Sequence, residues 1–315
     1  EPAVPPAAAP EGRYVNVNGT RLYYETTGPA NADAVVLLHQ FTMDARMWDE
    51  QVAALARRYR VIRYDARGFG RSQPIGGPYA TREDLRALLD ALEIARAHIV
   101  GLSMGARYAT DFALTYPARV RSLVLADPNV TGLRFSEQFT REFTAATAAG
   151  RSGDLAEAKR RWLGSSIFAA TRDNPDVMKR VREIVGGYSG WHFAHNDPAS
   201  VLSPPATQQL RRLTMPTLVI TGDRALPEVQ ALADRHRLRV VGQLLGRHVL
   251  VLRVHRRQRL LRQELQRHDR ADHQRRIVLQ PNDGQRARRR LHHGTLRRHD
   301  LGQRLLQHLH RLLLA

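Results

Sequence analysis

The fold of this chain is decided by the stretch Val100-Gly101-Leu102-Ser103-Met104-Gly105-Ala106. The apolar residues just before it are typical of a short buried strand, and Ala106, Ala109, Phe112, Ala113 and Tyr116 follow at helical spacing, with Pro117 as a stop. A Gly-x-Ser-x-Gly turn between a strand and a helix is so tight that side chains at Gly101 or Gly105 would collide with neighbouring elements. The pattern predicts that the Ser103 hydroxyl projects above a sheet, beside a helix N-terminus that favours negative charge. Ser103 is therefore a candidate nucleophile, and the alternative is a purely structural turn.

Strands and helices alternate on both sides of this turn. An Asn18-Gly19 turn predicts a hairpin over residues 14–25, and helical spacing appears between the later strands. Further strands are predicted at residues 34–38, 59–64, 120–127 and 215–222. This alternation predicts an α/β fold with a doubly wound, mostly parallel sheet. Ligands of such sheets bind at the carboxyl ends of the strands, where His39, Asp65, Ser103 and Asp127 all fall.

The alternation stops between residues 128 and 205, where apolar and aromatic residues recur with mainly helical spacing. We interpret this segment as an inserted helical cap over the strand ends. Its aromatic side chains are expected to form core rather than to contact a substrate.

Four motifs in order resemble those of the α/β-hydrolase superfamily, in particular its capped esterases, lactonases and cofactor-free haloperoxidase-like enzymes. They are the His39 turn, Asp65-x-Arg67-Gly68-x-Gly70-x-Ser72, the Ser103 turn, and Pro216-Thr217-Leu218-Val219-Ile220-Thr221-Gly222-Asp223. The resemblance covers residues 12–234. It implies an α/β-hydrolase core at 12–127 and 206–234, a helical cap at 128–205, and the nucleophile elbow of that superfamily at Ser103.

The resemblance also implies which groups hold the oxyanion. In the family these are two backbone N–H groups, which correspond here to those of Phe41 and Met104. Gln40 departs from the pattern, since the family usually has Gly there. His39 precedes the elbow, whereas the family order is Ser, acid, His, so we expect His39 to stabilise its turn rather than to act as a base.

The acid of the triad is less clearly marked. The family pattern places it three residues after Gly222, and that residue here is Ala225. Asp127 is the preferred candidate because some relatives supply the acid from the strand after the elbow, although Asp127-Pro128 also reads as a turn. Asp223 is the alternative, and a third reading is that the acid is missing.

The family signal ends near Arg235. Residues 235–315 contain 21 Arg and 10 His, five acidic residues, and no Ser, Lys, Met, Phe, Tyr or Trp. We interpret this Arg/His/Leu-rich tail as aberrant, through a frameshift or another cause, and expect it to be largely disordered or loosely attached. The alternative is a genuine Arg-rich binding arm. The catalytic histidine belongs in this region, where His248 is the first candidate and His255 the second.

Charge and composition exclude several classes of function. The formal net charge is +19, but the tail carries +16 of it, so residues 1–234 carry only +3 and nucleic acid is not the expected partner. The chain has no cysteine, which excludes disulfides and a thiolate nucleophile, and it has no apolar run long enough to span a bilayer. No metal site or cofactor is implied. Residues 1–11 resemble a linker of the kind that follows a removed signal peptide. Secreted, periplasmic and cytoplasmic locations all stay open. The oligomeric state is also open.

These observations favour a serine hydrolase that cleaves a small carboxylic ester or lactone through an acyl-enzyme on Ser103. Two alternatives stay open. One is a catalytically impaired homologue that binds small carbonyl compounds. The other is association with nucleic acid through the basic tail.

Overall fold

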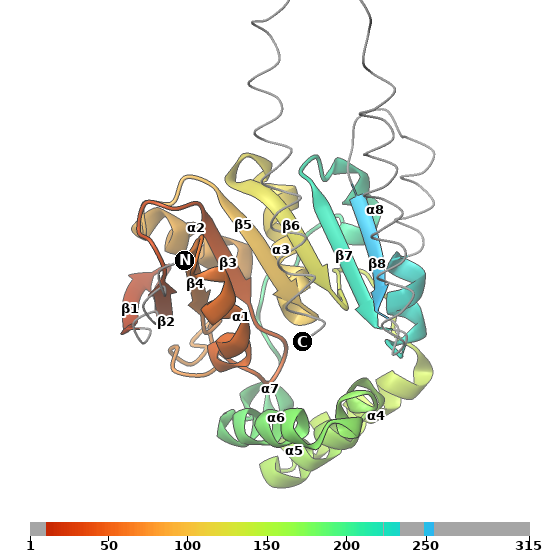
Figure 1. Cartoon of the computed structure of the whole chain (residues 1–315). Coiled ribbons are helices and arrows are strands. Elements are labelled where there is room, and N and C mark those ends of the chain that lie inside the picture. Colours follow the sequence, from red (N-terminus) through yellow and green to blue (C-terminus); the bar gives the residue numbers. More distant parts are fainter. Residues whose placement is uncertain (1–10, 223, 234–248, 255–315) are drawn as a thin grey trace, which may run out of the picture. The chain divides into compact units, whose positions relative to one another are not determined.

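The described residues form an eight-stranded sheet with the order β1-β2-β4-β3-β5-β6-β7-β8 (Figure 1). The structure, a computed structural model, describes residues 11–222, 224–233 and 249–254. β1 and β2 pair antiparallel, as do β2 and β4, whereas the pairs from β4 to β7 are all parallel. The strands are β1 (Glu11–Val17), β2 (Thr20–Thr27), β3 (Ala34–Leu38), β4 (Arg60–Tyr64), β5 (Ala97–Leu102), β6 (Val120–Ala126), β7 (Thr217–Gly222) and β8 (Val249–Val254). The mostly parallel α/β sheet predicted from the sequence is confirmed.

Burial explains the strand sequences. Every residue of β3 is buried, as expected for a continuous apolar strand covered on both faces. The β1–β2 hairpin turns at Asn18 and Gly19, whose φ angles are +45° and +68°. Asn and Gly adopt such positive φ values most readily, which fixes the turn at this dipeptide.

Helices cover the sheet on both faces. α1 (Asp49–Leu55) lies on one face, and α2 (Thr81–Ala91) and α3 (Met104–Thr115) lie on the other (Figure 1). α3 packs on β5, β6 and β3, so it runs under the middle of the sheet. It ends two residues before Pro117, as the sequence predicts.

A helical segment is inserted between β6 and β7. It consists of α4 (Glu137–Arg151), α5 (Leu155–Gly164), α6 (Pro175–Gly187) and α7 (Trp191–Ala194), and α8 (Ala206–Gln209) leads back to the sheet. Figure 1 shows α4 to α7 beyond the arrowheads of β5, β6 and β7. The described residues up to Leu252 belong to one compact unit, and the division into core, cap and tail stays a prediction. Among the helices of the described residues, none is long and apolar enough to cross a membrane.

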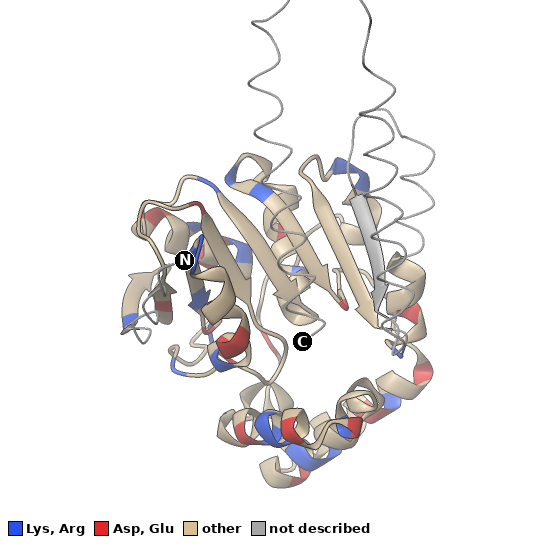
Figure 2. Ribbon diagram, in the orientation of Figure 1, with Lys and Arg blue, Asp and Glu red and all other residues tan. Residues whose placement is uncertain are grey.

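Acidic and basic residues are mixed on the longer helices of the insert. Figure 2 shows acidic and basic residues intermixed on α4 to α6, while the central strands carry few charges. Of the segment 235–315 only Val249–Val254 are described, as strand β8, an element that the sequence analysis did not predict. The expected disorder of the tail therefore concerns mainly residues outside the described ones.

Candidate active site

Ser103 lies at a strained turn between β5 and α3. Its φ and ψ are +52° and −110°, values that side-chain-bearing residues rarely adopt. A Cβ atom at Gly101 would lie 2.3 Å from the Gly105 carbonyl oxygen, and one at Gly105 would lie 2.1 Å from the Leu38 carbonyl oxygen. The two glycines are therefore required by close backbone approach, as predicted.

Neighbouring backbone holds the turn in place. The Ser103 N–H donates to the Ala126 carbonyl at 2.9 Å, and the Ser103 carbonyl accepts from the Arg107 N–H at 3.1 Å. The Asn129 N–H also donates to that carbonyl, at 3.3 Å. Because β6 and the first turn of α3 both bind the Ser103 backbone, its strained conformation is held before any substrate arrives.

The loop after β3 runs past Ser103. His39 is buried; its Nε2 accepts from the Ala66 N–H at 3.0 Å, so the protonated Nδ1 donates to the Gln40 carbonyl at 2.8 Å. Burial lowers the pKa of His39 and keeps it neutral. Since both ring nitrogens are bound to backbone, His39 stabilises the loop, in agreement with the prediction.

Gln40 occupies its position without strain. Of the described non-glycine residues, those with positive φ are Asn18, Thr42, Glu93, Ser103 and Asp127, so Gln40 has an ordinary backbone conformation. Its N–H points to the Met47 sulfur at 3.3 Å. Among the described residues, the next N–H, that of Phe41, has no hydrogen-bond acceptor, and neither has that of Met104 at the start of α3. These are the two donors predicted for an oxyanion.

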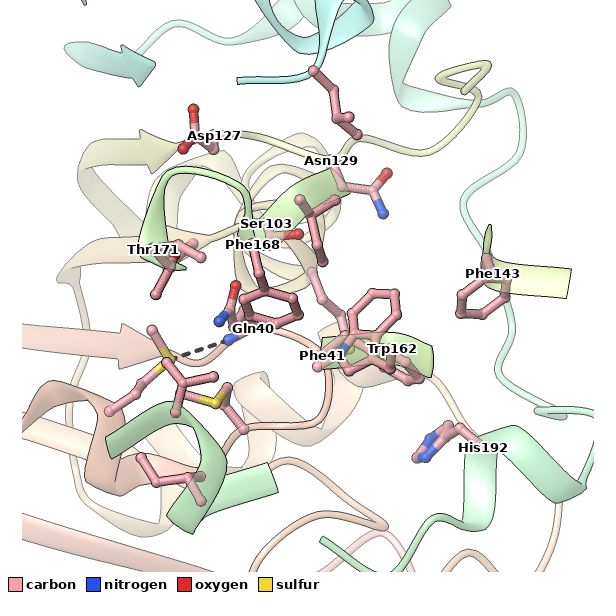
Figure 3. A pocket seen from close by; sticks show the side chains of 18 of the residues that line it. Gln40, Phe41, Ser103, Asp127, Asn129, Phe143, Trp162, Phe168, Thr171 and His192 are labelled. Atoms are coloured by element: carbon pink, nitrogen blue, oxygen red, sulfur yellow. Dashed lines mark hydrogen bonds between the residues drawn. The ribbon is translucent and has the colours of Figure 1, made fainter. Parts of the chain in front are cut away.

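A cavity of about 1290 Å³ opens above Ser103. Figure 3 shows Ser103, Phe41, Asp127, Trp162 and Phe168 around it. The inserted segment contributes aromatic side chains to the wall, namely Phe135, Phe139, Phe143, Trp162 and Phe168. Of these, Trp162 and Phe168 are also buried in the core, so the expectation that the aromatic residues of the insert form core holds for part of the set only.

A hydrogen bond links the insert to the loop after β3. The Trp162 Nε1–H donates to Thr42 Oγ1 at 2.7 Å, and the Thr42 hydroxyl donates to the Phe41 carbonyl at 2.6 Å. The Phe41 ring lies edge-on to that of Trp162, with centroids 5.2 Å apart. The insert thus fixes the backbone that carries one of the two free N–H groups. No sequence pattern around Trp162 indicates this role, because it depends on a contact with a loop 120 residues away.

Comparison with known proteins identifies the family. The family profile described as alpha/beta hydrolase fold matches residues 33–243, which is more than half of the chain. The chain belongs to the α/β-hydrolase family. Its resemblance to that family, drawn from four motifs, is confirmed, and the match extends somewhat beyond residue 234.

Relatives of the α/β-hydrolase family resemble the chain over most of their length. A 3-oxoadipate enol-lactonase of Acinetobacter baylyi is 30% identical over 66% of this chain and 77% of its own. A non-heme chloroperoxidase of Streptomyces lividans is 31% identical over 70% of this chain and 85% of its own. The crystal structure of the enol-lactonase from Burkholderia xenovorans superposes with a TM-score of 0.58, at 28% identity, over 76% of this chain and 91% of that one.

Asp127, the preferred acid candidate from the sequence, lies directly after β6. It lines the cavity, and its φ angle is +37°. The Asp127 Oδ1 accepts a hydrogen bond from the Gly222 N–H at 3.1 Å. The Asp127 N–H donates to the Ile220 carbonyl at 2.8 Å. Burial raises the pKa of this carboxyl, partly offset by the Gly222 hydrogen bond. Asp127 therefore joins β6 to β7 and also presents a carboxylate to the cavity.

The remaining triad candidates lie outside the described residues: Asp223, His248 and His255. Among the residues that the structure does describe, no side chain hydrogen-bonds the Ser103 hydroxyl. Ala225, at the family position of the acid, lines the cavity. In the same part of the chain, no three His, Cys, Asp or Glu residues are grouped as ligands for a metal ion.

Proposed function

We propose that this α/β-hydrolase cleaves carboxylic esters or lactones through an acyl-enzyme on Ser103. The observation that carries the proposal is the strained Ser103 turn in the wall of a large cavity, which Phe41 and Met104 also line; the N–H groups of these two residues have no acceptor among the described residues. The enol-lactonases among its relatives support a lactone or ester as substrate. A small molecule of this kind is the expected partner.

In the proposed reaction, the Ser103 hydroxyl attacks the carbonyl carbon while a histidine takes its proton. The N–H groups of Phe41 and Met104 stabilise the oxyanion; such donors contribute roughly 3–4 kcal/mol each because they are positioned before the charge develops. The alcohol leaves with the proton, and water then attacks the acyl-enzyme to release the acid. We assign His248 as the base, with His255 as the alternative, and Asp127 as the acid, with Asp223 as the alternative.

Substitution of the nucleophile tests the proposal. Ser103→Ala is expected to lower kcat on a p-nitrophenyl ester by at least ~10⁴-fold, because the acyl-enzyme cannot form, while the melting temperature stays close to that of the wild type. The matched control is Ser152→Ala, at an exposed serine outside the cavity, which should leave kcat unchanged. Activity of Ser103→Ala within a few-fold of the wild type would place the nucleophile elsewhere.

A second candidate function is binding of small carbonyl compounds without turnover. Ala225 at the family position of the acid favours it, because a triad without an acid loses about 10⁴-fold in turnover. A wild-type chain that binds an ester at equilibrium but releases no alcohol would support this candidate over the first. Nucleic-acid association through residues 235–315 stays a prediction, to be measured as salt-dependent DNA binding.

A further inference from the structure

Arg107 is a half-buried charge in the wall of the cavity. It lies in the first turn of α3, four residues after Ser103, and both residues line the cavity. Four other arginines that line the cavity have hydrogen-bonded or ion-paired partners: Arg46 with Asp44, Arg151 with Asn196, Arg180 with Asp49, and Arg224 with Asp173. Among the described residues, no carboxylate lies within ion-pair distance, 4.0 Å, of the Arg107 guanidinium.

The charge of Arg107 is retained despite this burial. Burial would lower its pKa, but the Tyr108 hydroxyl and the Asp111 and Asp197 carboxylates outweigh that effect and raise the pKa. A guanidinium has five N–H donors in a planar fork, which match a carboxylate well. A carboxylate bound in the cavity is therefore a complementary partner for Arg107.

A second side chain with an N–H donor lines the same cavity, His192 of α7. Its Nδ1 lies 2.7 Å from the Tyr188 hydroxyl, which also accepts the His192 N–H at 3.0 Å. Nδ1 is the acceptor available to the hydroxyl proton of Tyr188, so the ring proton belongs on Nε2. Burial lowers the pKa of His192 to about 4, so the ring is neutral at pH 7.

Within the described part of the chain, the Nε2–H of His192 has no hydrogen-bond partner, although its side chain is only 7% exposed. The distance from His192 Nε2 to Asp197 Oδ2 is 4.0 Å, which is too long for a hydrogen bond. The Asp197 side chain is also 28% exposed to water. A buried donor without a partner is costly, typically ~1–3 kcal/mol for the polar group, and a ligand oxygen would satisfy it.

We infer that the ester or lactone substrate carries a carboxylate, which Arg107 and the Nε2–H of His192 bind while the scissile carbonyl lies at Ser103. The inference rests on the proposed function, since it assigns a substrate class to the same cavity. Arg107 and His192 are then specificity-determining residues. Asp197 limits the affinity by repelling the same anion.

A pair of matched esters tests the inference on the full chain. Mono-p-nitrophenyl glutarate and p-nitrophenyl valerate differ in a terminal carboxylate against a methyl group. The wild type should hydrolyse the glutarate ester with the higher kcat/KM. Arg107→Met should lower the ratio of the two kcat/KM values by roughly 10–100-fold, the range for a hydrogen bond to a charged group, and Arg107→Lys should restore part of it.

The control is Arg151→Met, at an exposed cavity arginine already bonded to Asn196, and the ratio should stay within about twofold. If Ser103-dependent hydrolysis occurs but Arg107→Met leaves the ratio unchanged, the inference is overturned and the proposed function stands. If neither ester is hydrolysed, the proposed function fails, and calorimetry with glutarate then decides the inference by itself. Glutarate binding that is weakened by Arg107→Met and strengthened by Asp197→Asn sustains it; no binding, or equal binding by wild type and Arg107→Met, overturns it.

Discussion

At the scale of residues, backbone strain gathers at the cavity. Of the five described non-glycine residues with positive φ, three lie in or beside it: Thr42, Ser103 and Asp127. Each is held by hydrogen bonds, Thr42 by Trp162, Ser103 by Ala126, and Asp127 by Ile220 and Gly222. Such conformations cost of order 1–3 kcal/mol each and persist only where the surroundings hold them. The strain therefore marks where the fold positions chemical groups.

The choice of acid is testable at this scale. Asp127→Asn should lower kcat on a p-nitrophenyl ester by about 10³–10⁴-fold, because a neutral amide cannot stabilise a charged imidazole. The amide oxygen still accepts the Gly222 N–H, so the β6–β7 connection and the melting temperature should be kept. Asp223→Asn should change kcat by less than about tenfold. Equal losses, or a larger loss for Asp223→Asn, would reverse this ranking.

Ala225 offers a gain-of-function control for the same prediction. It lines the cavity at the family position of the acid, so Ala225→Asp adds a carboxylate there. In the Asp127→Asn background this second substitution should recover part of the lost kcat. No recovery, together with no effect of Asp127→Asn alone, would favour the candidate that binds carbonyl compounds without turnover.

At the scale of elements, the loop after β3 depends on the inserted helices. Trp162 on α5 donates a buried hydrogen bond to Thr42, and the Phe41 ring is in contact with the rings of Phe143, Tyr188, His192 and Phe193. One of the two proposed oxyanion donors is therefore positioned by a segment far away in the sequence. The insert is part of the active-site architecture as well as a wall of the cavity.

Trp162→Phe should separate positioning from binding. The substitution keeps an aromatic ring and removes the 2.7 Å hydrogen bond to Thr42 Oγ1. Small displacements of catalytic groups reduce rates strongly, so kcat should fall about tenfold while KM changes less than threefold, and stability should fall by about 1–2 kcal/mol. Steady-state kinetics and urea unfolding measure both. Trp191→Phe, in the same insert but outside the cavity wall, is the control; if it matches Trp162→Phe, the hydrogen bond has no special role.

At the scale of the whole molecule, local signals were sufficient for the fold and insufficient for the site. Short sequence patterns predict the close backbone approach at Gly101 and Gly105 and the burial of strand 34–38. The structure has both features. The Trp162–Thr42 hydrogen bond depends on a contact across the fold, and so does the burial of the His192 Nε2–H, which has no partner among the described residues. No local sequence pattern reveals either feature. The position of Arg107, four residues after Ser103, is a sequence signal that predicts a place near the same cavity.

Buried histidines give the whole molecule an acid-sensitive stability. His98 on β5 is 3% exposed, its Nδ1 lies 2.8 Å from Ser122 Oγ, and burial lowers its pKa to about 4. Its folded pKa is thus below the unfolded value of about 6.5, so the unfolded state binds more protons between these two values. The free energy of unfolding must fall as the pH drops through about 6.5, and the loss continues down to about 4. His98 alone should lower it by about 2 kcal/mol between pH 7 and pH 5.

Urea unfolding of the wild type and of His98→Gln at pH 7 and pH 5 isolates this contribution from those of His39 and His192. Glutamine does not titrate, so whatever it costs in packing is the same at both pH values. The wild type should therefore lose about 2 kcal/mol more than the variant between pH 7 and pH 5. A differential below about 0.5 kcal/mol for His98→Gln would mean that the imidazole is protonated without unfolding, and that its environment in β5 accepts the charge.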